Sequence, residues 1–441
     1  MKRAFTLLAC LALTMGAVWM LRAWAGGASV QPWGVGTAAL SLGLLLVGSF
    51  LLGETLSLAG LPRVSGALLF GMLAGPELHA ALGLGGAPLV PRPELHYLEL
   101  VDALAVSLIG LVAGGEIRVE FLRRSGRAIA RLVSAEMAGV LLLVGGGLAA
   151  LGGTVPLLAE RTPAQRAYLT AVLAALAVAN SPAIVTAMLR ETRADGTFAR
   201  TALAMTVVKD LALVIVVSAL LAGWSASSSS GATQAALGVS WHLLGSLVVG
   251  GFFAGLLWLA AARTRGRLDL VVLVTGFAIA LAGRMVGIAP LLAGITAGFA
   301  LANLAPRRSQ RLFRSIDDLL PATYALFFSV AGARVGLAGL GVLAPLAIGI
   351  SALRLTGLWC GVRAGCAWAG VRAPVRTWLW TSMVPQAGVS IALAAEARNA
   401  FAAEPWVDTL HGTLLAVVAL HEFIGPPLLR LGLLRCGEVR R

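Results

Sequence analysis

Long apolar segments recur along almost the whole chain, each separated from the next by a short polar connection. Hydrophobic residues make up 59% of the sequence and charged residues 12%, and the mean hydropathy is +0.89. A helix that crosses a membrane needs about 20 consecutive, mainly apolar residues, a length that soluble domains rarely contain. The sequence therefore predicts an all-α polytopic membrane protein rather than a soluble fold.

About thirteen of these segments are long enough to be core transmembrane helices. They are expected at residues 34–53, 62–84, 96–115, 128–150, 164–189, 199–222, 235–262, 268–284, 288–304, 318–338, 341–363, 375–397 and 407–429.

Arginine residues gather in alternate connections between the expected helices. Arginine-rich loops mark the cytoplasmic side of a membrane protein, so the core should begin outside and end inside, with a cytoplasmic C-terminus. The formal charge of +14 is also typical of nucleic-acid-binding proteins, but these arginines form no single basic face, so membrane lipid rather than nucleic acid is the expected partner. The arginine-rich connections lie at 118–127, 190–200, 263–267, 307–314 and 372–376 and in the short basic tail 435–441.

Residues 1–25 resemble a secretory signal peptide. Lys2 and Arg3 precede an apolar run from Ala4 to Leu21, and the small-residue sequence Ala23-Trp24-Ala25 follows. The apolar run is long for a signal peptide, so an uncleaved extra N-terminal helix is the alternative. Both alternatives deliver the first core helix from the outside.

Lys209 and Asp210 lie about halfway along the expected helix from Ala199 to Ala222, in a part that is otherwise apolar or hydroxyl-bearing. A carboxylate or an ammonium group at the centre of a membrane costs roughly 2.5 to 3.5 kcal/mol on insertion scales. Such groups are kept there mainly when they handle charge. We therefore expect the functional site at this pair.

Two proline-containing sequences interrupt expected helices. Residues 179–183, with Pro182, interrupt the fifth core helix, and residues 384–388, with Pro385, Gln386 and Gly388, interrupt the twelfth. Transporters place substrate sites at discontinuous helices in corresponding positions of two inverted repeats. An ordinary proline kink is the alternative at each position, but the two breaks on either side of a buried acid favour a transport site.

Oxygen atoms near Asp210 suit an alkali cation. Thr206 lies one helical turn before Asp210 on the same face, and Asn180 and Ser181 lie at the first break. Burial favours the protonated form of a carboxyl group, whereas a nearby cation favours its ionised form, so a proton and Na⁺ or K⁺ compete for one acid. If the site crosses the membrane only when it is occupied, this competition becomes exchange.

Several motifs, in the same order, resemble the bacterial monovalent cation/proton antiporter (sodium/hydrogen exchanger) family over residues 34–434. The motifs are Gly60-Leu61-Pro62-Arg63-Val64-Ser65-Gly66, Gly71-Met72-Leu73-Ala74-Gly75-Pro76, Gly114-Gly115-Glu116-Ile117, Asn180-Ser181-Pro182-Ala183, Val207-Val208-Lys209-Asp210-Leu211, Leu326-Phe327-Phe328-Ser329-Val330, Val384-Pro385-Gln386-Ala387-Gly388 and Glu422-Phe423-Ile424-Gly425-Pro426-Pro427.

This resemblance implies two inverted repeats with two crossed, discontinuous helices, and an elevator-like movement in a bacterial inner membrane. It implies a homodimer, with a dimerisation panel at 34–115 and 268–338 and an ion-transporting core at 126–222 and 341–434. Asp210 matches the family's ion- and proton-binding aspartate, and Arg354 matches a basic residue on the helix before the second broken one. The family usually has Asn or Asp where this chain has Lys209, which leaves the ion selectivity open.

Three interpretations of Lys209 stay open. A lysine close to Asp210 would act as a tethered cation that lowers cation affinity and adds a titratable group. A lysine paired with another acid would leave transport unaffected. The third interpretation is an anion carrier or a non-transporting membrane sensor, because Lys209 and Arg354 against a single aspartate would leave the pocket net positive. Glu136 is interpreted as a helix cap or as the partner of a loop arginine.

No enzyme, metal or cofactor site is predicted. The five histidines and four cysteines form no HExxH or CxxC motif, and no glycine run has the setting of a nucleotide site. Related potassium-efflux members of the family add a cytosolic nucleotide-binding domain after the last helix. Because this chain ends at Arg441, such gating is expected to be absent or to come from a separate cytosolic regulatory subunit.

Overall fold

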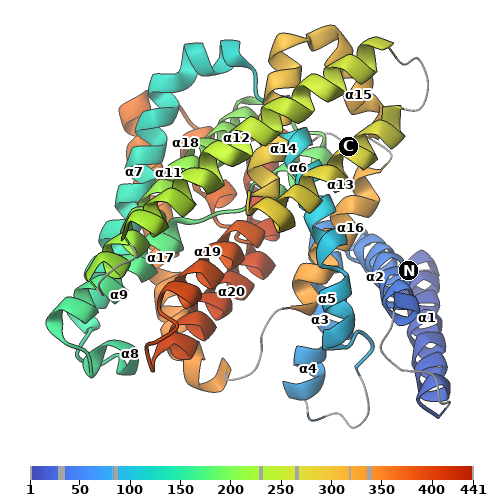
Figure 1. Ribbon diagram of the computed structural model, residues 1–441, viewed down its shortest axis with the longest axis horizontal. Coiled ribbons are helices and arrows are strands. Elements are labelled where there is room, and N and C mark those ends of the chain that lie inside the picture. Colours follow the sequence, from blue (N-terminus) through green and yellow to red (C-terminus); the bar gives the residue numbers. More distant parts are fainter. Residues whose placement is uncertain are drawn as a thin grey trace. The chain divides into compact units, whose positions relative to one another are not determined.

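The computed structural model describes residues 2–27, 35–81, 83, 88–227, 232–263, 268–316, 319–334 and 340–439. In these ranges the chain forms helices joined by turns and short loops, and it contains no strand (Figure 1). The predicted all-α class is therefore confirmed. The tail residues Arg440 and Arg441 lie outside the described residues.

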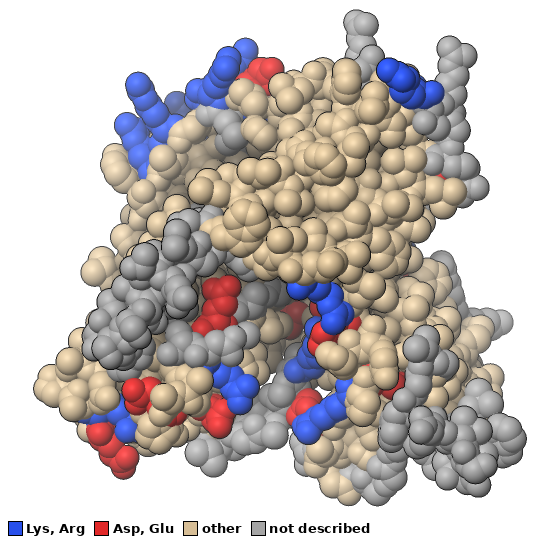
Figure 2. Space-filling view, in the orientation of Figure 1, with Lys and Arg blue, Asp and Glu red and all other residues tan. Residues whose placement is uncertain are grey.

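Several of the described helices match the length and composition of membrane spans. Uncharged side chains also make up most of the face shown in Figure 2. The integral membrane class is thus confirmed, whereas the thirteen core spans and their inverted repeats stay predictions. The seven segments that are long and apolar enough are Thr37–Leu58, Arg123–Leu151, Pro163–Thr192, Leu244–Arg263, Leu268–Val286, Leu343–Ala369 and Val407–Arg435. Four shorter apolar helices are Ala4–Val18, Arg63–Ala74, Pro290–Leu304 and Leu320–Ala333.

The chain divides into two compact units, each made from two separate stretches of sequence. Unit 1 contains Met1–Arg118 and His242–Ala338, and unit 2 contains Val119–Trp241 and Gly339–Arg441. The helix α12 (Ala232–Arg263) carries the chain from the second unit into the first.

Unit 1 is built around closely packed pairs of helices. Its helices besides the end of α12 are α1 (Lys2–Gly27), α2 (Val35–Leu58), α3 (Arg63–Ala74), α4 (Pro76–Ala81), α5 (Arg92–Tyr97), α6 (Glu99–Glu116), α13 (Leu268–Val286), α14 (Pro290–Leu304), α15 (Pro306–Ile316) and α16 (Leu320–Ala333). Helices α6 and α14 lie so close that a Cβ atom on Gly110 would lie 2.5 Å from the carbonyl oxygen of Leu291. Small residues permit this approach of two backbones in a membrane.

The N-terminal segment forms a helix that packs on α2. Leu11 and Val18 of α1 are buried in the same apolar cluster as Leu44 and Leu45 of α2. The residues that resemble a signal peptide therefore contribute to the core of unit 1.

Unit 2 contains the helices with the expected breaks. Its helices are α7 (Val119–Leu151), α8 (Pro156–Ala159), α9 (Pro163–Val178), α10 (Pro182–Thr192), α11 (Thr197–Ser227), α17 (Leu340–Ala369), α18 (Val375–Trp378), the 3₁₀ helix η1 (Leu379–Met383), α19 (Gly388–Ala400) and α20 (Val407–Arg435). The long helices α7 and α17 pack through glycines, and a Cβ atom on Gly361 would lie 2.6 Å from the carbonyl oxygen of Ala135. This pair supports the interrupted helices that hold the candidate site.

Candidate functional site

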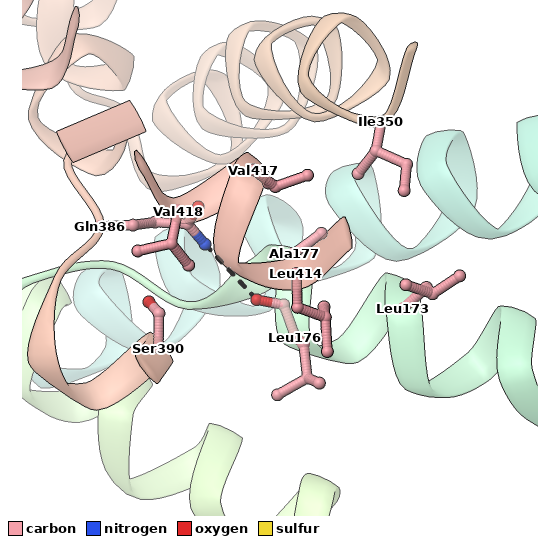
Figure 3. Close-up of a pocket in the computed structure, with 9 residues that line it drawn as sticks. All are labelled: Leu173, Leu176, Ala177, Ile350, Gln386, Ser390, Leu414, Val417 and Val418. Carbon is pink, nitrogen blue, oxygen red and sulfur yellow. Dashed lines mark hydrogen bonds between the residues drawn. The ribbon is translucent and has the colours of Figure 1, made fainter. Parts of the chain in front are cut away.

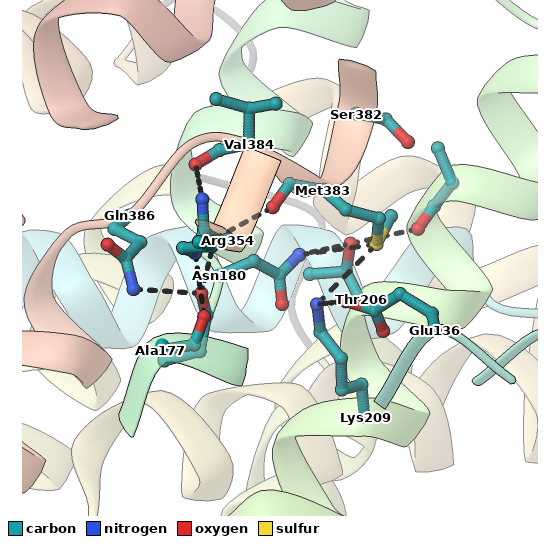
Figure 4. Close-up of polar contacts among 12 residues, drawn as sticks. Glu136, Ala177, Asn180, Thr206, Lys209, Arg354, Ser382, Met383, Val384 and Gln386 are labelled. Carbon is teal, nitrogen blue, oxygen red and sulfur yellow. Dashed lines mark hydrogen bonds and ion pairs between the residues drawn. The ribbon is translucent and has the colours of Figure 1, made fainter. Parts of the chain in front are cut away.

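The two interruptions in unit 2 lie side by side. The backbone N–H of Ser181, between α9 and α10, donates to the carbonyl oxygen of Pro385, between η1 and α19, over 2.9 Å. The side chain of Gln386 adds a second link, because its Nε2 donates to the carbonyl oxygen of Ala179 at 3.1 Å (Figure 4). Two breaks that are about 200 residues apart in sequence thus form one structural feature.

Local sequence explains where the helices stop and restart. Ser181 caps α10, since its Oγ accepts the N–H of Ile184 at 3.2 Å, and Pro182 occupies the first turn, where a missing N–H does no harm. Pro385 cannot donate a helical hydrogen bond, and the chain resumes an α-helix only at Gly388. Ser181, Pro182, Pro385, Gln386 and Gly388 therefore all lie at or beside the breaks.

Arg354 of α17 joins the helix ends that these breaks leave. The side chain is completely buried, and its Nε donates to the carbonyl oxygen of Ala177 at 2.6 Å. Its Nη2 donates to Ala179 and Met383 at 2.8 and 3.0 Å, and its Nη1 to Val384 at 2.9 Å (Figure 4).

The carbonyl groups at a helix C-terminus lack partners within the helix and attract cations. Arg354 satisfies such groups at the end of α9 and at the end of η1 with one guanidinium. The side chain that the sequence suggested as a charge partner thus acts first as a hydrogen-bonding link between the two broken segments.

Asp210 is buried on α11, with 9% of its surface exposed. Neither of its carboxylate oxygens accepts a hydrogen bond from any residue that the structure describes, and the same holds for Oδ1 of Asn180. Buried polar atoms are nearly always satisfied by protein, water or an ion. The carboxylate of Asp210 could therefore take up a proton, and all three oxygen atoms could serve as cation ligands.

Asn180 and Thr206 connect the first break to α11. The Nδ2 of Asn180 donates to Oγ1 of Thr206 at 2.9 Å, and that hydroxyl donates to the carbonyl oxygen of Ala202 at 2.9 Å. This arrangement orients the Asn180 amide, because its nitrogen is held by the hydroxyl one turn before Asp210. Among the described residues, no group of three or more His, Cys, Asp or Glu side chains is arranged to hold a metal ion.

Lys209 is bound to Glu136 of α7. The Nζ atom lies 2.8 Å from Oε1 of Glu136, and both side chains have no exposed surface. The Sδ atom of Met383 lies 3.7 Å from the same Nζ. The interpretation of Glu136 as a helix cap or a partner of a loop arginine is wrong, because the acid points to a lysine inside the unit.

Glu136 is the site residue that sequence reasoning missed. It lies in the expected helix 128–150, among apolar neighbours and well beyond the arginine-rich loop, so its depth was the available signal. Its presence also changes the charge of the cluster formed by Glu136, Lys209, Asp210 and Arg354, in which two acids face two bases. The anion-carrier interpretation counted a single aspartate against two bases, and this count omitted Glu136.

A small pocket lies beside the breaks but does not contain Asp210. Most of its lining is apolar, and Gln386 and Ser390 supply the polar atoms (Figure 3). An apolar lining does not suit a bare cation, so we do not assign the cation site to this pocket. The remaining lining residues are Leu173, Leu176, Ala177, Ile350, Leu414, Val417 and Val418.

Comparisons with known proteins agree with the family that the motifs resemble. The family model of the transmembrane sodium/hydrogen exchangers matches residues 33–431. No curated protein sequence matches the chain.

Two solved structures of the sodium proton antiporter MjNhaP1 from Methanocaldococcus jannaschii have a similar fold. The structure at pH 8 has a TM-score of 0.61 at 18% identity and covers 90% of this chain and 95% of that one. The electron-microscopy structure has a TM-score of 0.68 at 18% identity and covers 92% of this chain and 100% of that one.

The family consists of secondary transporters rather than enzymes, so the prediction that the chain is not an enzyme is confirmed. Since the family model covers most of the sequence, this chain belongs to the sodium/hydrogen exchanger family of transmembrane proteins.

Proposed function

We propose that the protein exchanges a monovalent cation, Na⁺ or K⁺, for protons, and that both bind at Asp210 in turn. The observation that carries this proposal is the buried carboxylate of Asp210, whose two oxygens accept no hydrogen bond from the described residues. An ionised carboxylate in a membrane interior is expensive, so it binds a proton or a cation before the site moves. Binding of one excludes the other, which is the requirement for exchange.

The cation ligands that we propose are the oxygens nearest to the break and to α11. The free Oδ1 of Asn180 and the carboxylate of Asp210 are the main ligands, and Thr206 keeps one lone pair after its two hydrogen bonds. The hydroxyl of Ser181 caps α10 and therefore contributes more to the shape of the break than to the ion.

Alternating access is the mechanism that we propose for unit 2. Its first stretch contains α7, the interrupted pair α9 and α10, and α11, while its second contains α17, the interrupted pair η1 and α19, and α20. This equal order of elements supports two repeats, which we propose to be inverted, and all the residues of the candidate site belong to this unit. Unit 1 then serves as the dimerisation panel of a homodimer.

The proposed orientation follows from the arginine-rich connections. From these connections we propose a cytoplasmic C-terminus, and from the resemblance to bacterial antiporters we propose a bacterial inner membrane. A separate cytosolic regulatory subunit would act from that side.

A charge argument favours a cation over an anion as the substrate. The anion-carrier alternative depended on an excess of positive charge at the site, and Glu136 cancels the charge of Lys209. A non-transporting sensor would show no cation-driven proton flux when it is reconstituted into liposomes.

The test is reconstitution of the protein into liposomes that contain a pH dye, with Na⁺, K⁺ and Li⁺ added in turn. We expect cation-driven proton movement in the native protein and its loss in Asp210→Asn. Asp195→Asn is the matched control, because Asp195 is an exposed acid that pairs with Arg200 outside the site. Equal dye responses from native and Asp210→Asn vesicles would refute the mechanism.

A further inference from the structure

The Lys209–Glu136 pair lies directly beside the proposed exchange site. Lys209 and Asp210 are adjacent on α11. The Lys209 ammonium group is nevertheless hydrogen-bonded to Glu136 of a different helix. One buried ammonium group therefore has an acid next to it in sequence and is bound to another.

The chemistry of the lysine side chain explains why it matters which acid Lys209 binds. Lysine has a flexible stem of four carbons and a compact charge, so its ammonium group can change partner when one partner is lost. Adjacent helical residues point about 100° apart, so the Lys209 stem does not face Asp210 and only its flexible end could turn toward that acid. Glu136, on the different helix α7, binds this end instead.

We propose that Glu136 is a positioning residue that holds Lys209 away from Asp210, so that Asp210 alone exchanges its partner, one cation for one proton. The inference rests on the proposed function of Asp210. With Lys209 bound to Glu136 and Arg354 bound to four carbonyl oxygens, Asp210 is the acid of this cluster that exchanges its partner.

Charge counting gives the stoichiometry. The charges of Glu136 and Lys209 cancel, and the charge of Arg354 is fixed. The cluster therefore has the same net charge whether Asp210 holds a proton or a monovalent cation. One step outward and one step inward then move equal charge, so the cycle is electrically silent.

Loss of Glu136 has a specific consequence for the cation. In Glu136→Gln, Lys209 turns to Asp210, the acid next to it in sequence. An incoming Na⁺ or K⁺ must then displace the ammonium group, so the KM for the cation rises while the maximal rate falls much less. If Lys209 is removed as well, Asp210 is free again.

The first measurement is the KM for the cation in liposomes that contain the pH dye. We expect Glu136→Gln to raise this KM roughly tenfold and the double variant Glu136→Gln with Lys209→Met to return it to within about threefold of the native value, the scale of one lost competing ion pair. Glu54→Gln is the matched control, because it removes a buried acid from an ion pair in unit 1.

The second measurement is the cation gradient at which proton movement stops, with and without an imposed membrane potential. For the native protein we expect no change with potential. Transport of one uncompensated charge per cycle would shift this gradient by roughly 50-fold per 100 mV. A native gradient that shifts in this way overturns the one-for-one exchange.

Other outcomes separate the inference from the proposed function. An unchanged KM in Glu136→Gln, or a raised KM that the double variant does not restore, overturns the role of Glu136 and leaves Asp210 intact. If Glu136→Gln does not fold, the double variant decides, since it removes both charges of the Lys209–Glu136 pair and must retain a silent cycle and a KM within about threefold of the native value. Exchange that persists in Asp210→Asn would instead refute the proposed function.

Discussion

The Lys209–Glu136 pair of unit 2 and the Arg63–Glu54 pair of unit 1 have nearly equal N–O distances of 2.8 and 2.7 Å. Their surroundings differ, since both members of the first pair are fully buried, whereas the Arg63 side chain is 57% exposed. Breaking a buried pair leaves an uncompensated charge inside the protein, whereas an exposed charge remains solvated. The two pairs have similar geometry, but their different burial predicts that breaking them has unequal effects on the free energy of unfolding.

The largest effect is expected from breaking the buried pair on one side. Glu136→Gln should lower the free energy of unfolding by about 3–5 kcal/mol, because Lys209 stays buried without its partner. The double variant with Lys209→Met should recover most of that loss. The measurement is denaturant unfolding in detergent, and equal losses in the single and double variants would contradict the difference between the two pairs.

The next effect concerns Arg354, whose positive charge is stabilised by hydrogen bonds to carbonyl groups rather than by an ion pair with an acid. Arg354→Lys keeps the charge but lacks the planar set of donors that reaches four carbonyl oxygens. We expect a loss of about 2–4 kcal/mol, the worth of one or two hydrogen bonds to a charged group. An unchanged thermal midpoint would show that the charge alone is required.

A smaller effect is expected at the link between the first break and α11. Asn180→Ala removes the hydrogen bond to Thr206 and a proposed cation ligand, so the KM for the cation should rise about tenfold, equivalent to about 1.4 kcal/mol. Ser382→Ala serves as the control, because its hydroxyl donates only to the carbonyl oxygen of Leu379 within η1. A raised KM in the control would mean that any disturbance near the breaks has this effect.

The smallest effect is expected at the Arg63–Glu54 pair of unit 1. Glu54→Gln should change the free energy of unfolding by no more than about 1 kcal/mol, since the Arg63 that loses its partner is exposed and remains solvated. Proton exchange in liposomes should be native. A loss as large as that of Glu136→Gln would remove the distinction between the two units.

Composition and the order of motifs were enough to predict the membrane class, the helical fold and the family. These properties depend on local composition and on the order of motifs, and long apolar segments have few alternatives to helices in a bilayer. The positions of the two helix breaks could also be predicted from the sequence, because Pro182 and Pro385 lack a backbone N–H donor in any arrangement of the helices.

The contacts between side chains inside unit 2 could not be predicted in this way, because they depend on the packing of the helices. Lys209 and Glu136 are 73 residues apart, and Arg354 reaches carbonyl groups up to 177 residues away. Such contacts depend on how each helix is rotated and packed against its neighbours, and the glycines that let α7 approach α17 set that packing. The sequence predicts two acids and two bases at similar depth in the membrane. Which of them form pairs depends on distances of a few ångströms between side chains of different helices.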